Sequence, residues 1–282
     1  MQTTLYMLQE QRRSPMMSFI LQTKNGKIIV IDGGFREDAQ YLLDTLTQLG
    51  GPNPEIELWL LTHPHLDHAD ALPEIFTRPN PPRVKAIYSR FLSYEFYKAN
   101  DFEGCTDART TREFNEFAAE HPDICHTFEK GQRFAVDSAV INVLRVPEDE
   151  SLTNNAINNS SVVFRLDTEG QRILFVGDLG EEGGDRVLAT VPREELRADF
   201  IQMAHHGENG VKKSFYEAVG PRACLWTTPG WLWDNDKGEG QGSGPWRTLE
   251  VRGWMEELGI EHHFITKDGD HKFVLPYSLE SA

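Results

Sequence analysis

The sequence predicts an α/β fold in which two β-sheets lie back to back with helices on their outer faces. The apolar runs, such as residues 28–31, are short enough to be strands, whereas residues 38–49 carry apolar side chains at helical spacing. The order strands, helix, strand and polar motif also occurs twice along the chain. Two sheets arranged in this way bury one face against each other and the other face beneath helices.

The first half of the chain alternates short strands with helical segments. Asp38 is a possible N-cap of the first helix and Gly50-Gly51 closes it, while a turn at Asn25-Gly26 suits a type I′ hairpin between the first two strands. The expected strands are 18–23, 27–31, 56–61 and 84–88. The expected helices are 38–49, 70–76 and 90–120, the last interrupted at 101–106 and forming a candidate lid or pocket wall.

The second half is richer in strands. A hairpin is expected around Glu169-Gly170, and a helix at 246–258 is closed by Gly259. The expected strands are 124–128, 132–136, 140–146, 161–166, 172–176, 200–203, 223–227, 262–266 and 272–275.

Length and composition favour one large unit. The chain has 282 residues, of which 39% are hydrophobic, and its polar motifs run from Asp32 to His206, so that a cut in the middle would divide them. We therefore expect a single domain over residues 1–282. No segment approaches the ~20 apolar residues that cross a bilayer, and residues 1–17 lack the apolar core of a signal peptide. The three cysteines are widely spaced and odd in number, which fits a reducing compartment. We therefore expect a cytoplasmic protein without membrane contact.

The chain is strongly acidic, since 28 basic and 44 acidic residues give a net charge of −16. Such a field repels a polyanion unless basic side chains are concentrated locally. Adjacent basic pairs occur at Arg12-Arg13 and Lys212-Lys213, and pairs of this kind are usually solvated surface. We therefore expect a small-molecule substrate and regard nucleic acid as unlikely. The sequence leaves the oligomeric state open.

The six residues from His63 to His68, His-Pro-His-Leu-Asp-His, are the most informative part of the sequence. They place three of the ten histidines and a carboxylate directly after an expected strand. Imidazole nitrogens and carboxylate oxygens are the ligands that zinc and its first-row neighbours take. His63 and His65 point the same way in extended chain, while Asp67 and His68 can face a second ion. The alternative, a polar surface loop, leaves this ligand spacing unexplained.

The motif resembles the His-x-His-x-Asp-His signature of the metallo-β-lactamase superfamily, and the resemblance continues along the chain. Residues 31–34 resemble its first motif, residues 175–178 the strand that ends in a metal-bridging Asp, and residues 204–207 its last ligand motif. Residues 158–163, with His-His-Gly at 205–207, are most similar to the branch of late-competence DNA-uptake protein domains and phosphorylcholine esterases. The resemblance implies a four-layer αββα sandwich.

The resemblance also implies a centre of two divalent transition-metal ions, with zinc expected first and manganese or iron as alternatives. The expected ligands are His63, His65 and Asp178 for one ion, and Asp67, His68, Asp178 and His206 for the other. Asp67 is also expected to take part in catalysis. His205 is either a proton donor to the leaving group or the ligand in place of His206. Asp32 and Asn159 are expected to support the ligands without binding metal.

One ligand of the usual set is missing. The superfamily usually supplies a His between the first cluster and the bridging Asp, but no His lies between His126 and His205. The asparagine-rich segment 154–159 occupies that place, so a side-chain amide or a water would complete the shell of the first ion. Glu208 stands where the branch often has Ser and changes the pocket wall.

These features predict a dinuclear metal-dependent hydrolase acting on a small-molecule phosphodiester. A hydroxide bridging the two ions would attack phosphorus while the ions stabilise the developing charge. The alternatives are a metal-dependent nuclease, a lactonase or thioester hydrolase, and a metal-binding protein without turnover. In segment 226–246, four tryptophans bracket a glycine-rich run. We expect them to pin a long loop to the core; the alternative is that they close over an apolar or cationic group.

Overall fold

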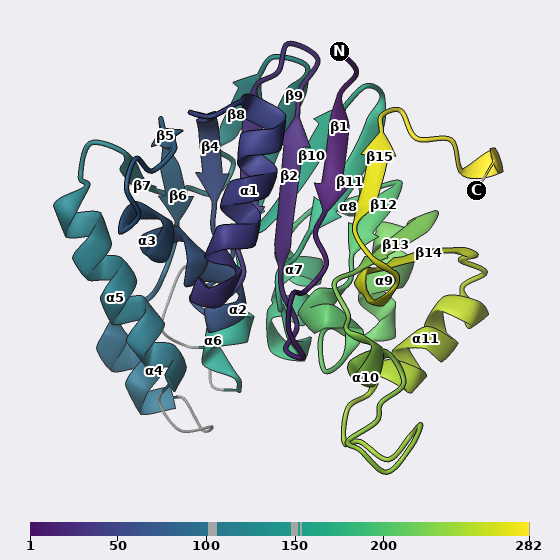
Figure 1. The fold of residues 1–282 in the computed structure, drawn as a ribbon. Coiled ribbons are helices and arrows are strands. Elements are labelled where there is room, and N and C mark those ends of the chain that lie inside the picture. Colours follow the sequence, from purple (N-terminus) through teal and green to yellow (C-terminus); the bar gives the residue numbers. More distant parts are fainter. Residues whose placement is uncertain (101–105, 148–151, 153, 282) are drawn as a thin grey trace.

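Two β-sheets pack face to face in the computed structural model, which describes residues 1–100, 106–147, 152 and 154–281 (Figure 1). The first sheet runs β15-β1-β2-β3-β4-β6-β7, with β5 beside β4, and the second runs β14-β13-β12-β11-β10-β9-β8. Helices cover the outer faces of both sheets. The chain therefore has the four-layer αββα architecture that the sequence predicts.

The first sheet takes its strands from the first half of the chain and from one late segment. Its strands are β1 (Thr4–Met7), β2 (Ser18–Gln22), β3 (Ile28–Asp32), β4 (Glu55–Leu60), β5 (Arg83–Val84), β6 (Ile87–Ser89), β7 (Cys125–Thr127) and β15 (His271–Val274). The late strand β15 pairs antiparallel with β1 and joins the end of the chain to its beginning.

The strands of the second sheet follow one another along the chain, with no described strand of the first sheet between them. Its strands are β8 (Arg133–Val136), β9 (Ala139–Arg145), β10 (Val163–Thr168), β11 (Gln171–Phe175), β12 (Phe200–Gln202), β13 (Ala223–Trp226) and β14 (His262–Ile265). Strands β11 to β14 run parallel to one another, so that their carboxyl ends open at one edge. That edge carries the polar motifs of the second half.

Each sheet has its own outer layer of helices. Over the first sheet lie α1 (Ala39–Gly50), α2 (Leu66–Ala69), α3 (Ala71–Phe76) and α5 (Thr106–Glu120), while α4 (Tyr94–Asn100) packs beside α5. The second half contributes α6 (Ala156–Asn159), α7 (Glu181–Thr190), α8 (Arg193–Leu196), α9 (Lys213–Val219), α10 (Gly230–Trp233) and α11 (Thr248–Glu257).

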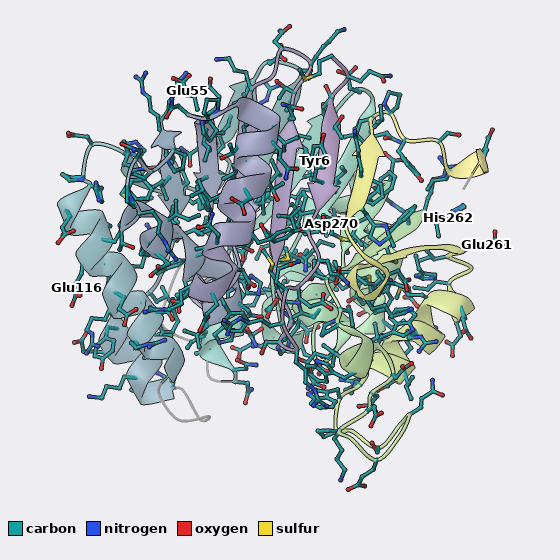
Figure 2. All side chains as sticks on the ribbon, viewed as in Figure 1. Tyr6, Glu55, Glu116, Glu261, His262 and Asp270 are labelled. Carbon is teal, nitrogen blue, oxygen red and sulfur yellow. The ribbon has the colours of Figure 1, made fainter. Side chains whose placement is uncertain are left out.

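The space between the sheets is filled by alternating apolar side chains. Phe19 of β2 meets Phe175 of β11 edge to face, with ring centroids 5.1 Å apart. Both rings are fully buried in a cluster that draws on both sheets. Burying such a side chain contributes about 1.5–3 kcal/mol, so this layer fixes how the two sheets dock. Charged side chains such as Glu116 and Glu261 lie on the outside instead (Figure 2).

Several expectations about single elements need correction. Residues 84–88 form two short strands, and α1 begins after a 3₁₀ turn in which Asp38 accepts a hydrogen bond from the Phe35 amide, so that its side chain does not cap α1. The turn at Asn25-Gly26 is not type I′, because only Gly26 of this pair has positive φ. In the hairpin at Glu169-Gly170, by contrast, both residues have positive φ.

Two further expectations concern the helical region 90–120 and membrane-spanning segments. Helix α4 ends at Asn100 and α5 begins at Thr106, and the interruption predicted between them falls on residues 101–105, which lie outside the described residues. None of the helices described is both long and apolar enough to cross a membrane.

Candidate metal centre

The predicted ligands lie where strands of both sheets end. His63 follows β4, and α2 begins at Leu66, so that Asp67 and His68 occupy its first turn. Asp178 follows β11, and His206 lies in a 3₁₀ turn after β12. The ends of rigid strands hold side chains in fixed positions, which a metal site requires.

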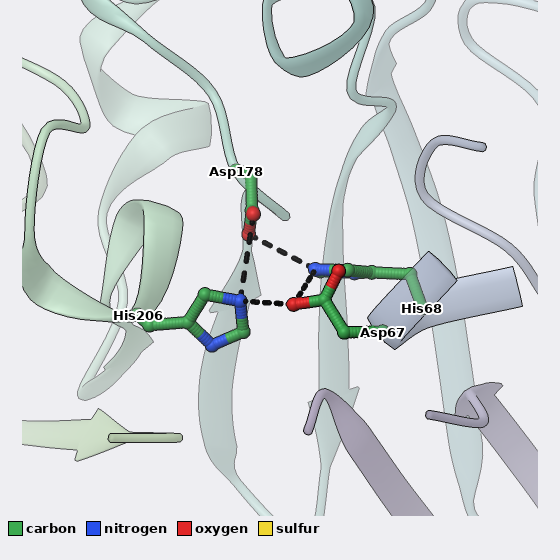
Figure 3. Close-up of side chains that lie close together, drawn as sticks. All are labelled: Asp67, His68, Asp178 and His206. Atoms are coloured by element: carbon green, nitrogen blue, oxygen red, sulfur yellow. Dashed lines mark ion pairs between the residues drawn. The ribbon is translucent and has the colours of Figure 1, made fainter. Parts of the chain in front are cut away.

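Four of these side chains form one cluster (Figure 3). His206 Nε2 lies 2.9 Å from Asp67 Oδ2 and 3.5 Å from Asp178 Oδ2, and His68 Nε2 lies 3.2 Å from Asp178 Oδ1. One ligand atom from each of the four residues lies within 4.8 Å of the others. We call this group the four-donor cluster.

A second group shares the same carboxylate. His63, His65 and Asp178 also place one ligand atom each within 4.8 Å of one another. His63 Nε2 lies 3.8 Å from Asp178 Oδ2, and the rings of His63 and His65 are 4.7 Å apart. We call this group the three-donor cluster. The structure thus brings together the six side chains that the sequence proposes as ligands, with Asp178 between the two groups.

The donor atoms suit cations. Among the described residues, His63 Nε2, His68 Nε2, His206 Nε2 and Asp178 Oδ1 are buried without a hydrogen-bond partner. Carboxylate oxygens lie 2.9–3.8 Å from the three nitrogens, so each imidazole faces negative charge. A buried polar atom left without a partner costs about 1–3 kcal/mol, and divalent cations, one in each cluster, would satisfy these atoms.

His68 is held in one orientation from behind. Asp32 accepts hydrogen bonds from the backbone and hydroxyl of Thr62, both at 2.8 Å, and lies 2.8 Å from His68 Nδ1. With the proton of His68 on Nδ1, its Nε2 lone pair is available to a metal. Asp32 therefore occupies the supporting position proposed for it, whereas Thr62 was not foreseen.

His206 is oriented by a backbone carbonyl. Its Nδ1 lies 2.8 Å from Thr227 O, and the Thr228 hydroxyl donates to His206 O at 2.6 Å. Gly207 follows with φ +79°, and a Cβ there would lie 2.2 Å from the ring of Trp226. Only glycine fits this position, so the histidine turn packs tightly against β13.

The turn that presents Asp178 is clamped by its neighbours. Gln202 accepts from the Val176 amide at 2.9 Å and donates to Gly177 O at 3.0 Å, and Ser161 Oγ accepts from the Asp178 amide at 3.1 Å. Gln202 is fully buried. A polar side chain inside a buried apolar strand was the available sign of this role.

Protonation in this cluster follows its charges. Burial disfavours the charged form of His68, but the carboxylates of Asp178, Asp67 and Asp32 outweigh it and raise its pKa to about 10. Burial likewise opposes a charge on His206, yet Asp178 raises its pKa well above the usual value. For Asp178, burial is outweighed by His68 and His206, and its pKa lies well below the usual range. These charges favour protonated histidines beside ionised carboxylates, and a metal ion would bind by displacing protons from the histidines.

His205 and the asparagines lie beside the clusters. His205 Nε2 is 3.3 Å from Glu208 Oε1 and 3.8 Å from Asp178 Oδ2, but His205 belongs to neither group of converging atoms. The geometry therefore favours His206 over His205 for the four-donor cluster. Asn159 accepts from the Gly183 amide and donates to Asn154 O, so its amide ties its segment to α7.

The tryptophan segment is anchored to the protein. Trp226 is fully buried and meets Trp233 edge to face at 5.2 Å. Trp231 meets Trp246 in the same way at 4.7 Å and donates a hydrogen bond to the backbone of Arg13. Trp226 belongs to the core as the last residue of β13, and Trp233 of α10 packs against the same core cluster.

Comparison with known proteins places these motifs in a wider context. The family model of the metallo-beta-lactamase superfamily matches residues 15–103. Endoribonuclease YSH1 of Saccharomyces cerevisiae is 28% identical over 190 residues, 64% of this chain and 23% of that protein. ComE operon protein 3 of Bacillus subtilis is 32% identical over 69 residues, 24% of this chain and 9% of that protein. The chain thus spans less than a quarter of the length of these relatives.

Solved structures share the fold. The metallo-beta-lactamase fold protein YhfI from Bacillus subtilis superimposes with a TM-score of 0.53 at 11% identity, covering 96% of this chain and 99% of that chain. Zn(2+)-bound PqqB from Methylobacterium extorquens gives a TM-score of 0.50 at 15% identity, covering 92% and 87%. At such low identity these matches establish the architecture alone.

Proposed function

We propose that this chain, which belongs to the metallo-β-lactamase superfamily, is a metal-dependent hydrolase that cleaves phosphodiester bonds in a small molecule at a centre of two metal ions. The observation that carries the proposal is the pair of buried donor clusters that share Asp178. A carboxylate shared in this way offsets the repulsion between two neighbouring cations.

The proposed ligands divide the work of holding the ions. His63, His65 and Asp178 would hold one ion, and Asp67, His68, Asp178 and His206 would hold the other. When bound, such ions activate water and stabilise negative charge on a phosphoryl group. Histidine with carboxylate suits zinc first, and manganese or iron next. Asp67 has its side chain 15% exposed, so it also borders the space that substrate enters.

The chain's own residues prepare the centre before substrate arrives. Asp32 and Thr227 fix the imidazoles of His68 and His206, and Ser161 and Gln202 fix the turn of Asp178. Donors that need no rearrangement during the reaction lower its barrier. His205, 16% exposed beside Asp178, is placed to contact a substrate or leaving group.

Phosphodiesters are favoured as substrates by the relatives. The similarity to an endoribonuclease covers 64% of this chain, and cleavage of RNA breaks a phosphodiester bond. A small substrate is favoured by the net charge of −16, which repels long polyanions. The same similarity makes a metal-dependent nuclease the second candidate, against the expectation drawn from charge.

We test the substrate class by direct comparison. Metal-reconstituted protein is assayed side by side with bis-p-nitrophenyl phosphate, a lactone and a single-stranded RNA at physiological salt. We expect the small diester to turn over fastest. Rapid RNA cleavage would promote the nuclease, and lactone turnover far above diester turnover would replace phosphodiester chemistry by carboxyl ester chemistry.

We further propose one domain and a reducing, cytoplasmic compartment. Support for one domain comes from the ligands, because both sheets contribute to each cluster. Support for the compartment comes from Cys125 and Cys224, which are both free thiols; Cys105 lies outside the described residues. Partition of the protein between soluble and periplasmic or secreted fractions tests the compartment.

A further inference from the structure

The two donor clusters are unequal. The four-donor cluster has a carboxylate and two imidazoles of its own beside the shared Asp178, whereas the three-donor cluster has two imidazoles beside it. A neutral amide oxygen could add a further donor to the smaller cluster. The segment 154–159 supplies four asparagines close to this place in the chain.

Three of the four amides are accounted for. Asn154 and Asn155 are exposed. Asn159 uses both ends of its amide, because its oxygen accepts from the Gly183 amide at 2.7 Å and its nitrogen donates to Asn154 O. Asn158 differs, since it is 2% exposed and its Oδ1 is buried without a hydrogen-bond partner in the described structure. Leaving a buried carbonyl oxygen unpaired costs about 1–3 kcal/mol.

The Asn158 amide lies beside the metal centre. The Asn158 Nδ2 atom is 3.4 Å from His205 Nε2, and His205 Nε2 is in turn 3.8 Å from Asp178 Oδ2. The backbone of Asn158 is also linked to the turn that carries Asp178. Asn158 O accepts a hydrogen bond from the Ser161 amide, and Ser161 Oγ accepts one from the Asp178 amide. With its nitrogen directed at His205, the amide leaves its oxygen for another partner.

We propose that Asn158 Oδ1 is a ligand of the ion held by His63, His65 and Asp178. The inference rests on the proposed function, since it presupposes that ions bind the two clusters. An amide oxygen is neutral and binds more weakly than an imidazole or a carboxylate, so this ion is the weaker of the two. Oxygen ligands suit manganese better than nitrogen ligands do, and this position therefore tolerates manganese more readily than the four-donor cluster does.

Metal content provides the test, independent of activity. Asn158→Ala removes the oxygen, Asn158→Asp keeps an oxygen and adds charge, and Asn154→Ala removes an exposed amide of the same segment as the control. Each protein is stripped with a chelator and titrated with zinc and with manganese. Bound metal is measured by elemental analysis, and folding by circular dichroism and thermal melting.

The expected pattern is specific. Asn158→Ala keeps one tight ion and binds the second at least about tenfold more weakly, the lower end of losses for groups that support a metal site. Asn158→Asp binds the second ion more tightly than wild type does, and Asn154→Ala matches wild type. Two ions bound to Asn158→Ala with wild-type affinity would overturn this inference alone. Wild-type protein that binds no ion would overturn the proposed function together with it.

If Asn158→Ala does not fold, Asn158→Asp decides the matter. A wild-type affinity of its second ion, in a protein that melts at the wild-type temperature, would exclude contact between this side chain and the ion.

Discussion

The two donor clusters share one carboxylate but are built differently around it. In the four-donor cluster, two imidazoles are fixed from behind, His68 by Asp32 and His206 by Thr227 O. In the three-donor cluster, His63 Nδ1 lies 3.1 Å from the hydroxyl of Thr62, which itself donates to Asp32. The histidines of the four-donor cluster thus contact a carboxylate or a backbone carbonyl directly. In the three-donor cluster, His63 reaches the carboxylate of Asp32 only through the hydroxyl of Thr62.

This difference teaches how one chain can hold two ions with unequal strength. More ligands with firmer support mean less reorganisation when an ion binds. We therefore expect the four-donor cluster to fill first and empty last. The three-donor cluster would bind the ion that exchanges with solvent, which leaves room there for substrate.

The largest effect is expected when the carboxylate that both clusters share is neutralised. Asp178→Asn keeps the shape of the shared side chain but removes the charge that both clusters use, so both ions should bind more weakly. We expect kcat to fall by at least about 100-fold, the scale of lost electrostatic stabilisation. Steady-state kinetics with elemental analysis measure both effects. Exposed Asp123→Asn is the control, and near-normal turnover of Asp178→Asn with both ions present would refute the shared-carboxylate assignment.

Asp32→Asn should weaken both clusters, and the four-donor cluster more, because Asp32 contacts His68 directly but reaches His63 only through Thr62. An amide cannot replace a carboxylate that accepts from Thr62 and also fixes His68. We expect the affinity of the four-donor cluster to fall by about 10–100-fold, the usual loss when support for a ligand is removed. Competition with a calibrated chelator measures it. An unchanged affinity of the tight ion would show that Asp32 serves folding alone.

Stepwise removal of metal should reveal the order of release. An ion present at about 100 times its dissociation constant stabilises the fold by about 2.7 kcal/mol, so losing one ion should lower Tm by roughly 5–10 °C. With rising chelator concentration we expect two steps, the first from the three-donor cluster. Calorimetry of the titrated protein shows them, and a single step with simultaneous loss of both ions would contradict unequal binding.

The smallest effect is expected at Thr227. Its hydroxyl lies 3.1 Å from His206 Nδ1, but its backbone carbonyl is closer, at 2.8 Å. Thr227→Val retains that carbonyl, so metal affinity should change by less than about threefold, comparable to one weak neutral hydrogen bond. A tenfold loss in the chelator assay would assign the orientation of His206 to the hydroxyl.

The sequence predicted the elements whose periodicity is strong. Strands β2, β3 and β4 and helix α1 were identified from apolar patterns, but α7 was not, because Gly183 and Gly184 lower its helix propensity. The structure gives the reason for these glycines: a Cβ on Gly183 would lie 2.8 Å from Asn159 Oδ1, and one on Gly184 would lie 2.8 Å from Val211. Close packing between distant segments overrides local preference here.

The proposed ligands of the candidate site could be predicted from the sequence, but the contacts that orient them could not. The spacing of residues 63–68 specified a metal site, and the resemblance supplied Asp178 and His206. Thr227 could not be found because its contribution is a backbone carbonyl, which any residue type would provide. Asn158 and Asn159 are adjacent in a one-turn helix, and their roles depend on side-chain directions that an isolated sequence does not encode.

The pairing of β15 with β1 bears on how the protein is made. A ribosome releases all proposed ligands, from His63 to His206, before it reaches β15 at His271–Val274. During that interval the nascent chain can gather its ligands, while β1 still presents an unpaired edge. Open edges invite pairing with strands of other chains. Synthesis of β15 then covers the edge of β1 and moves the open edge of this sheet to the short strand β15.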